Sequence, residues 1–104
     1  MPSRTEQFQT LVSRQPGNEL FRFSLAQALE AEGRNAEAEE HLIFCIAKKA
    51  DWMMPRILLG KLLLEQGRPA EARPLLESAL QLAIDQQHET PEAELRSLLA
   101  AMAT

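Results

Sequence analysis

The chain has little of what catalysis, metal binding or disulfide formation requires. Its 104 residues include one cysteine, Cys45, two histidines, His41 and His88, and no tyrosine. A single cysteine cannot form an internal disulfide, so we expect a reducing, cytoplasmic setting. One cysteine and two histidines spread along the chain make a poor ligand set for an ion, and we expect neither a metal nor a cofactor.

Basic residues are also few and scattered. The formal net charge is −4, and no stretch holds more than two adjacent basic residues, Lys48 and Lys49. This leaves no basic patch for nucleic acid or for an anionic membrane surface. The polar start, residues 1–5, lacks the apolar run of a secretory signal, and the longest apolar run, residues 57–64, is interrupted by Lys61. We therefore expect no nucleic-acid partner and no membrane association.

What the chain does have is leucine, alanine and glutamate in abundance, which favours helices over strands. It also repeats itself. Residues 25–38 align with residues 59–72 at an offset of 34, which is the distance from Gly33 to Gly67. Each copy reads as two amphipathic runs separated by its glycine. A fixed period of this length is typical of helical repeat proteins, in which each unit is one pair of helices.

The residues around the two glycines predict a helix end followed by a new helix start. Glycine at a helix end takes the left-handed conformation at no steric cost, so Gly33 and Gly67 are predicted to be hairpin turns. Asn35 is predicted to cap the next helix in the first copy, and Pro69 to occupy a first-turn position in the second.

The period and the residues at fixed places resemble the tetratricopeptide repeat family. The matches place leucine, then a small residue, and later alanine, leucine and another small residue at Leu25, Ala26, Leu29, Gly33, Ala38, Leu42 and Cys45, and at Leu59, Gly60, Leu63, Gly67, Ala72, Leu76 and Ala79. Small residues are expected where the two helices of a hairpin cross closely. Arg22 and Arg56 depart from the family pattern, which often has tryptophan there.

This resemblance implies an all-α fold, a right-handed superhelical stack of antiparallel helix hairpins (an α-α solenoid) with about six helices. It is that of a small two-repeat protein of the bacterial type. We expect a single domain, residues 1–104, with a helix at 3–15, repeats at 19–52 and 53–86, and a closing helix at 91–103 capped by Thr90. The flanking helices supply the ends that two repeats alone would lack. Pro74 falls inside a predicted helix and is expected to bend it mildly rather than break it.

Catalytic groups are scarce, and we expect no enzyme activity. His41 and Cys45 stand four residues apart on one predicted helix, a spacing that can pair a thiol with a base. Cys45, however, occupies a place where the family packs alanine, so a buried core residue is the favoured interpretation. His41 is then a groove or surface residue. The acids Glu37, Glu39 and Glu40 have a sufficient structural reason at a helix start.

The function implied by the resemblance is that of a protein-interaction scaffold. In the family, the first helices of successive repeats line a concave groove, which binds a protein or peptide segment. The corresponding positions here are Leu20, Phe23, Gln27, Glu30, Met54, Ile57, Lys61 and Leu64. Their apolar members offer a hydrophobic seat, and Gln27 and Lys61 offer polar contacts.

Two alternatives to an open groove remain. The second of these first helices is apolar nearly all round, so part of the predicted groove, together with Trp52 and Met53, can belong to the core. The apolar stripe can also be buried by a second copy of the chain, as a homodimer or other homo-oligomer.

Overall fold

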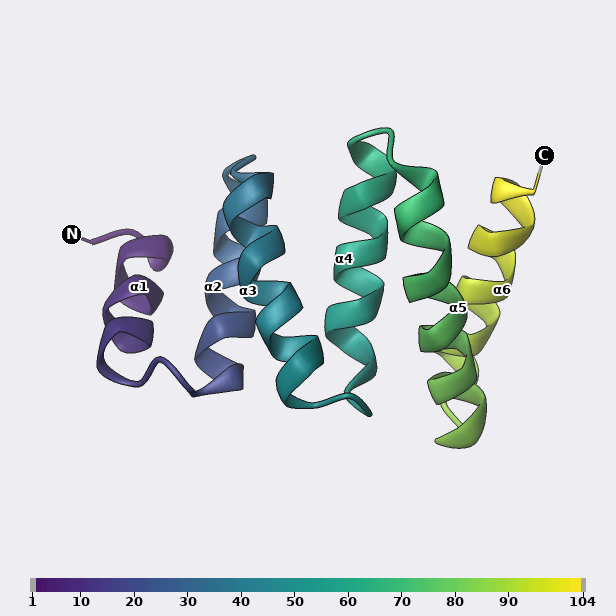
Figure 1. The fold of residues 1–104 in the computed structure, drawn as a ribbon, viewed down its shortest axis with the longest axis horizontal. Helices are drawn as coiled ribbons and strands as arrows, with labels where there is room; N and C mark the ends of the chain where they lie inside the picture. Colours follow the sequence, from purple (N-terminus) through teal and green to yellow (C-terminus); the bar gives the residue numbers. More distant parts are fainter. Residues whose placement is uncertain (1, 104) are drawn as a thin grey trace. The chain divides into compact units, whose positions relative to one another are not determined.

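The structure, a computed structural model, describes residues 2–103. These residues form six α-helices and no strand (Figure 1), which confirms the all-α prediction. The helices are α1 (Arg4–Arg14), α2 (Glu19–Ala31), α3 (Asn35–Lys48), α4 (Met53–Glu65), α5 (Pro69–Asp85) and α6 (Glu89–Met102). Within the described range, no helix combines the length and the apolar character that a membrane span requires.

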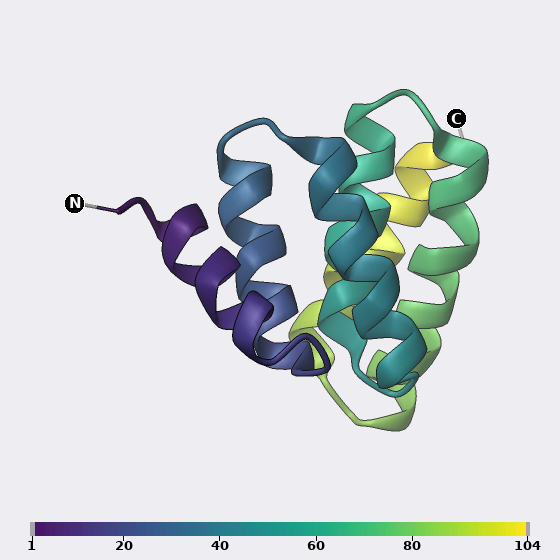
Figure 2. The same cartoon turned by 60° about the vertical axis from the view of Figure 1, so that its left-hand side comes forward.

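The chain divides into two compact units, one ending at Ala50 and the other beginning at Asp51. In the first unit, α2 packs against both α1 and α3. In the second unit, α5 packs against both α4 and α6. Figures 1 and 2 show that α2 and α3 form one antiparallel hairpin and that α4 and α5 form another.

Both predicted hairpin turns have the same main-chain geometry. Gly33 and Gly67 take left-handed conformations, with φ of 76° and 72°. The amide of Arg34 donates to the carbonyl of Leu29 at 2.9 Å, and the amide of Arg68 donates to the carbonyl of Leu63 at 2.9 Å. These bonds satisfy carbonyls that the helix end would otherwise leave unpaired. The prediction of two glycine turns is confirmed.

The cores of the two hairpins are built from the residues that carry the family resemblance. Apart from the two turn glycines, all of them are buried: Leu25, Ala26, Leu29, Ala38, Leu42 and Cys45 in the first unit, and Leu59, Gly60, Leu63, Ala72, Leu76 and Ala79 in the second. A fully buried leucine side chain contributes about 1.5–3 kcal/mol through the hydrophobic effect. The stripe of leucines and small residues therefore stabilises each hairpin.

The helix starts differ in part from the prediction. Pro69 is the first residue of α5, as expected. Asn35 is not a cap, because α3 begins at Asn35 itself and Arg34 precedes it without a side-chain bond. Thr90 is not a cap either, because α6 begins at Glu89. The side-chain cap that the sequence did not single out is Asn18, whose Oδ1 accepts from the amide of Phe21 at 3.1 Å.

Pro74 lies inside α5 without ending it. The helix runs 17 residues from Pro69 to Asp85, so the expectation that Pro74 does not break it is confirmed. The side chain of Pro74 is exposed. Water can therefore hydrate the carbonyl whose helical partner the proline removes, which lowers the cost of proline at this place.

Candidate functional site

Arg22 on α2 is the polar centre of the first hairpin. Its Nε donates to the carbonyl of Pro16 at 2.8 Å, and its guanidinium carbon lies 4.1 Å from the centre of the Phe44 ring on α3. Its Nη1 lies 3.4 Å from Nδ1 of His41. A guanidinium stacked on an aromatic ring in this way is held by a cation–π interaction. Arg22 thus joins α2 to α3 at the place where the family often has tryptophan.

Arg56 occupies the equivalent place in the second hairpin. It follows Arg22 by 34 residues, and its Nη1 donates to the hydroxyl of Ser78 at 3.1 Å. Ser78 in turn follows Phe44 by 34 residues. The same pair of repeat positions therefore joins the two helices in both hairpins, by ring stacking in one and by a hydrogen bond in the other. These arginines are structural parts of the hairpins.

His41 and Cys45 do not form a thiol–base pair. The Cys45 thiol is buried and donates to the carbonyl of Glu19 at 3.4 Å. Burial raises the pKa of the thiol to about 11, although the nearby Arg22 acts in the opposite direction. Burial and the charge of Arg22 together lower the pKa of His41. The half-buried His41 thus faces α2 through Arg22, which corrects the expectation of a groove or surface histidine, and Cys45 is the core residue that was predicted.

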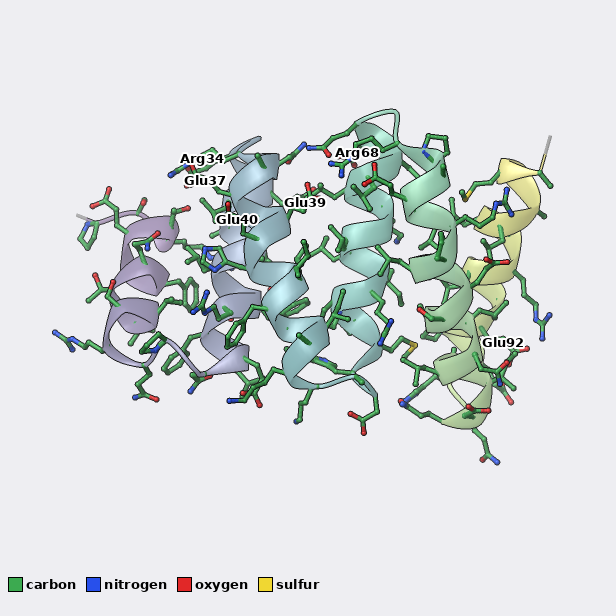
Figure 3. All side chains as sticks on the ribbon, viewed as in Figure 1. Arg34, Glu37, Glu39, Glu40, Arg68 and Glu92 are labelled. Atoms are coloured by element: carbon green, nitrogen blue, oxygen red, sulfur yellow. The ribbon has the colours of Figure 1, made fainter. Side chains whose placement is uncertain are left out.

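The acidic residues at the helix starts are held in exposed ion pairs. Glu37 lies 2.6 Å from Arg34, and both side chains meet at the start of α3 (Figure 3). Glu71 lies 2.6 Å from Arg68 at the start of α5, and the hydrogen bond from Arg68 lowers the pKa of Glu71. The described residues hold no cluster of three or more histidine, cysteine or acidic side chains with the geometry of a metal site.

The predicted groove residues of the first unit all lie on α2. Leu20 is the most exposed of them, at 61%, and Gln27 is also exposed. Phe23 and Glu30 are half-buried. This face therefore presents one large apolar side chain and one amide to solvent.

The predicted groove residues of the second unit lie on α4. Met54 is 45% exposed and Lys61 is exposed, while Ile57 and Leu64 are half-buried. Of the two residues that precede Met54, Met53 is buried and Trp52 is half-buried. Met53 thus belongs to the core, in line with the alternative in which part of this segment is packed.

A cleft of about 650 Å³ lies between α4 and α6 within the second unit. Lys61 lines it from α4, and four residues line it from α6: Ala93, Glu94, Ser97 and Leu98. The sequence analysis had placed only Lys61 there and had treated α6 as a closing helix. A signal was present, because Leu95 and Leu99 follow Leu59 and Leu63 by 36 residues. The longer α5 shifts the period and hides the match.

A second, polar cleft of about 350 Å³ lies in the first unit, where Thr5, Glu6, Gln9 and Thr10 of α1 face Arg34. The Thr5 hydroxyl donates to the carboxylate of Glu32, and the Arg34 guanidinium is held by Glu32 and Glu37. Its cation is therefore already paired, which leaves little to attract a ligand.

Paired helices of one repeated length, closed by glycine turns, define a helical repeat protein. Two models of the tetratricopeptide repeat family match the chain, at residues 6–42 and at residues 53–78. The chain belongs to the tetratricopeptide repeat family. Among curated protein sequences, none matches it.

Solved structures with the same fold include the type III secretion translocator chaperone SycD of Yersinia enterocolitica. It is 20% identical, with a TM-score of 0.90 over 95% of this chain and 69% of that one. A second SycD structure, described as an alternative dimer, is 20% identical with a TM-score of 0.87 over 95% of this chain and 76% of that one. Protein BPP2914 of Bordetella parapertussis is 27% identical, with a TM-score of 0.83 over 99% of this chain and 90% of that one.

Proposed function

We propose that this chain is a non-catalytic scaffold that binds a segment of another protein through the first helices of its repeats, α2 and α4. The observation that carries the proposal is an apolar position that recurs in both repeats. Leu20 and Met54 lie 34 residues apart, at the start of α2 and of α4, and they are 61% and 45% exposed. The same repeat position therefore offers a large apolar side chain to solvent in each unit.

The recurrence separates these two residues from other exposed apolar side chains. Single exposed hydrophobic residues are common and need no explanation. Ile43 and Ile84 are also exposed, but their equivalents in the other repeat are Glu77 and Ala50. A feature that two repeats share is more readily explained by a shared use than by chance. Large apolar side chains are the usual anchors of protein interfaces.

The comparisons support the same class of function. The family is one of protein-interaction repeats, and SycD is described as a chaperone for a secreted translocator. A single free cysteine that is buried suits the cytoplasm, where thiols stay reduced, and we propose that location for the scaffold.

The alternative is self-assembly, in which a second copy covers Leu20 and Met54. The description of SycD as forming an alternative dimer favours this reading for that relative. In a homodimer with two-fold symmetry, the same patch appears on both sides of the interface. Substitution of the two residues would then change the oligomeric state instead of the partner.

The test compares two double variants. Leu20→Ser with Met54→Ser removes the recurring apolar pair, and Ile43→Ser with Ile84→Ser removes an equally exposed pair that does not recur. We expect the first variant to lose its cross-linked protein partners in cells, and the second to keep them. Equal partner sets for both variants would contradict the proposal. Sedimentation velocity of the wild type distinguishes the homodimer, since a monomer at micromolar concentration removes that alternative.

A further inference from the structure

The cleft between α4 and α6 carries two opposite charges that nothing in the protein neutralises. Lys61 lines it from α4 and Glu94 from α6, and both side chains are exposed. Among residues 2–103, neither has an ion-pair partner within 4.0 Å. In contrast, Arg34, Arg68 and Arg96 each lie within 3.5 Å of a carboxylate. Lys61 and Glu94 are therefore available to charges on a bound molecule.

The α6 wall of the cleft also offers a hydroxyl that its own helix does not use. Ser13 and Ser78 lie within helices and donate to carbonyls of the same helix, those of Gln9 and Leu75. Ser97 makes no such bond within the described chain and lines the cleft. A hydroxyl both donates and accepts, so Ser97 can bond a main-chain amide or carbonyl of a ligand.

The shape of this wall suits an extended chain. Ala93 and Ser97 stand four residues apart, which puts two short side chains on the same face of α6. Short side chains let a main chain approach closely, and the half-buried Leu98 beside them adds apolar surface. An extended segment has unpaired amides and carbonyls, which Ser97 can satisfy, whereas the main chain of a helix is already bonded internally.

We infer that this cleft binds an extended segment of a partner protein that carries an acidic side chain for Lys61 and a basic side chain for Glu94. The inference rests on the proposed scaffold function and names the chemistry of its partner. Because the two charges lie on opposite walls, they also fix the direction in which the segment runs. Glu94 repels a purely acidic segment and Lys61 repels a purely basic one, so the pair discriminates between partners.

The experiment selects peptides from a display library of random short sequences, using the full chain as bait. Three baits are compared: the wild type, the exchange variant with Lys61→Glu and Glu94→Lys, and a control with Lys48→Glu and Glu77→Lys. The control alters two exposed charges outside the cleft and keeps the net charge. We expect the wild type and the control to enrich peptides with an acidic and a basic residue at fixed spacing.

The exchange variant should enrich peptides in which the order of the two charges is reversed. For a peptide selected on the wild type, Lys61→Gln should weaken binding about fivefold, as the loss of one partly exposed ion pair predicts. Enrichment of the same peptides by the wild type and the exchange variant would overturn the inference. So would enrichment of no charged pair, or of no peptide. These results would leave the Leu20 and Met54 test of the scaffold function unaffected.

A second copy of the chain as the occupant would give a different result. The exchange variant would then lose self-association in sedimentation velocity, and this outcome also overturns the inference. Neither substitution touches a buried group, so circular dichroism should show the wild-type helix content in all baits.

Discussion

Gly60 of α4 lies so close to Leu76 of α5 that a Cβ atom on Gly60 would be 2.5 Å from Cδ2 of Leu76. Leu76 is fully buried, so it has little room to move. Alanine is favoured over glycine in a helix by about 1 kcal/mol, but overpacking costs about 1–3 kcal/mol. We expect Gly60→Ala to lower the free energy of unfolding by about 1 kcal/mol, measured by urea denaturation.

A double variant controls for this effect. Leu76→Ala alone should cost about 2–5 kcal/mol because it leaves a cavity. Combined with Gly60→Ala it should cost less than the two single changes together, since the new methyl group then has space. Additive costs would show that the contact between the two residues does not limit the hairpin.

The cap at Asn18 gives a second prediction. Its Oδ1 accepts from the amide of Phe21, so Asn18→Ala should lower the free energy of unfolding by about 1 kcal/mol. Asn35→Ala is the matched control, because Asn35 is the first residue of α3 and makes no capping bond. Chemical denaturation of both variants measures the difference. A larger loss for Asn35→Ala than for Asn18→Ala would contradict the assignment of the caps.

The turn before α6 is formed by a residue that strains it. Gln87 has a φ of 58°, in the left-handed region where a side chain costs about 1–2 kcal/mol. Its amide donates to the carbonyl of Ile84 at 3.2 Å, and that of His88 to Ala83 at 2.9 Å, as in the glycine turns. We expect Gln87→Gly to raise the thermal midpoint and Gly67→Gln to lower it. A fall for Gln87→Gly would exclude this strain.

The contact of His41 with Arg22 predicts a dependence of stability on pH. The pKa of His41 is lowered in the folded chain, by burial first and by the charge of Arg22 second, against the opposing effects of Glu40 and Glu37. The folded state therefore prefers the neutral ring. Its contribution is fully present above the unfolded pKa of about 6.5 and is lost as the pH falls through the lower, folded value.

His41→Gln removes this titration. Between pH 7.5 and about 5.5, its free energy of unfolding should fall less than that of the wild type. Urea denaturation at a series of pH values measures both slopes. Parallel slopes would mean that the ring and the guanidinium do not interact in solution.

The buried Cys45 thiol should be chemically inert in the folded protein. Its pKa of about 11 keeps it protonated near neutral pH, and the thiolate is the reactive form. We expect no alkylation by iodoacetamide at pH 7.5 in the native state and complete alkylation in urea, both followed by mass spectrometry. Rapid native alkylation would instead support the thiol–base pairing of Cys45 with His41.

The sequence predicted the hairpins well because their determinants are local. The glycine turns, the leucine stripe and the small residues at close contacts all follow from side-chain size and backbone freedom at fixed spacing. The caps were less predictable, since Asn35 and Thr90 have the right chemistry but each falls inside its helix. Side-chain type alone does not fix a helix start to one residue.

The candidate site was only partly predictable for a different reason. Lys61 follows from the repeat register, but the residues of α6 opposite it do not, because α5 has 17 residues and α3 has 14. The added length moves the register by two residues, from 34 to 36. Likewise, no local pattern tells that Arg22 stacks on Phe44, which lies on the other helix of the hairpin.

The turns at Gly33 and Gly67 are copies of each other down to single bonds. Each has one amide bond of 2.9 Å from an arginine to a leucine carbonyl, and each has an Arg–Glu pair at 2.6 Å. Every one of these contacts is made within the turn itself. The turn is thus a self-contained cassette, and evolution or a designer can lengthen such an array by duplicating it without inventing new loop chemistry.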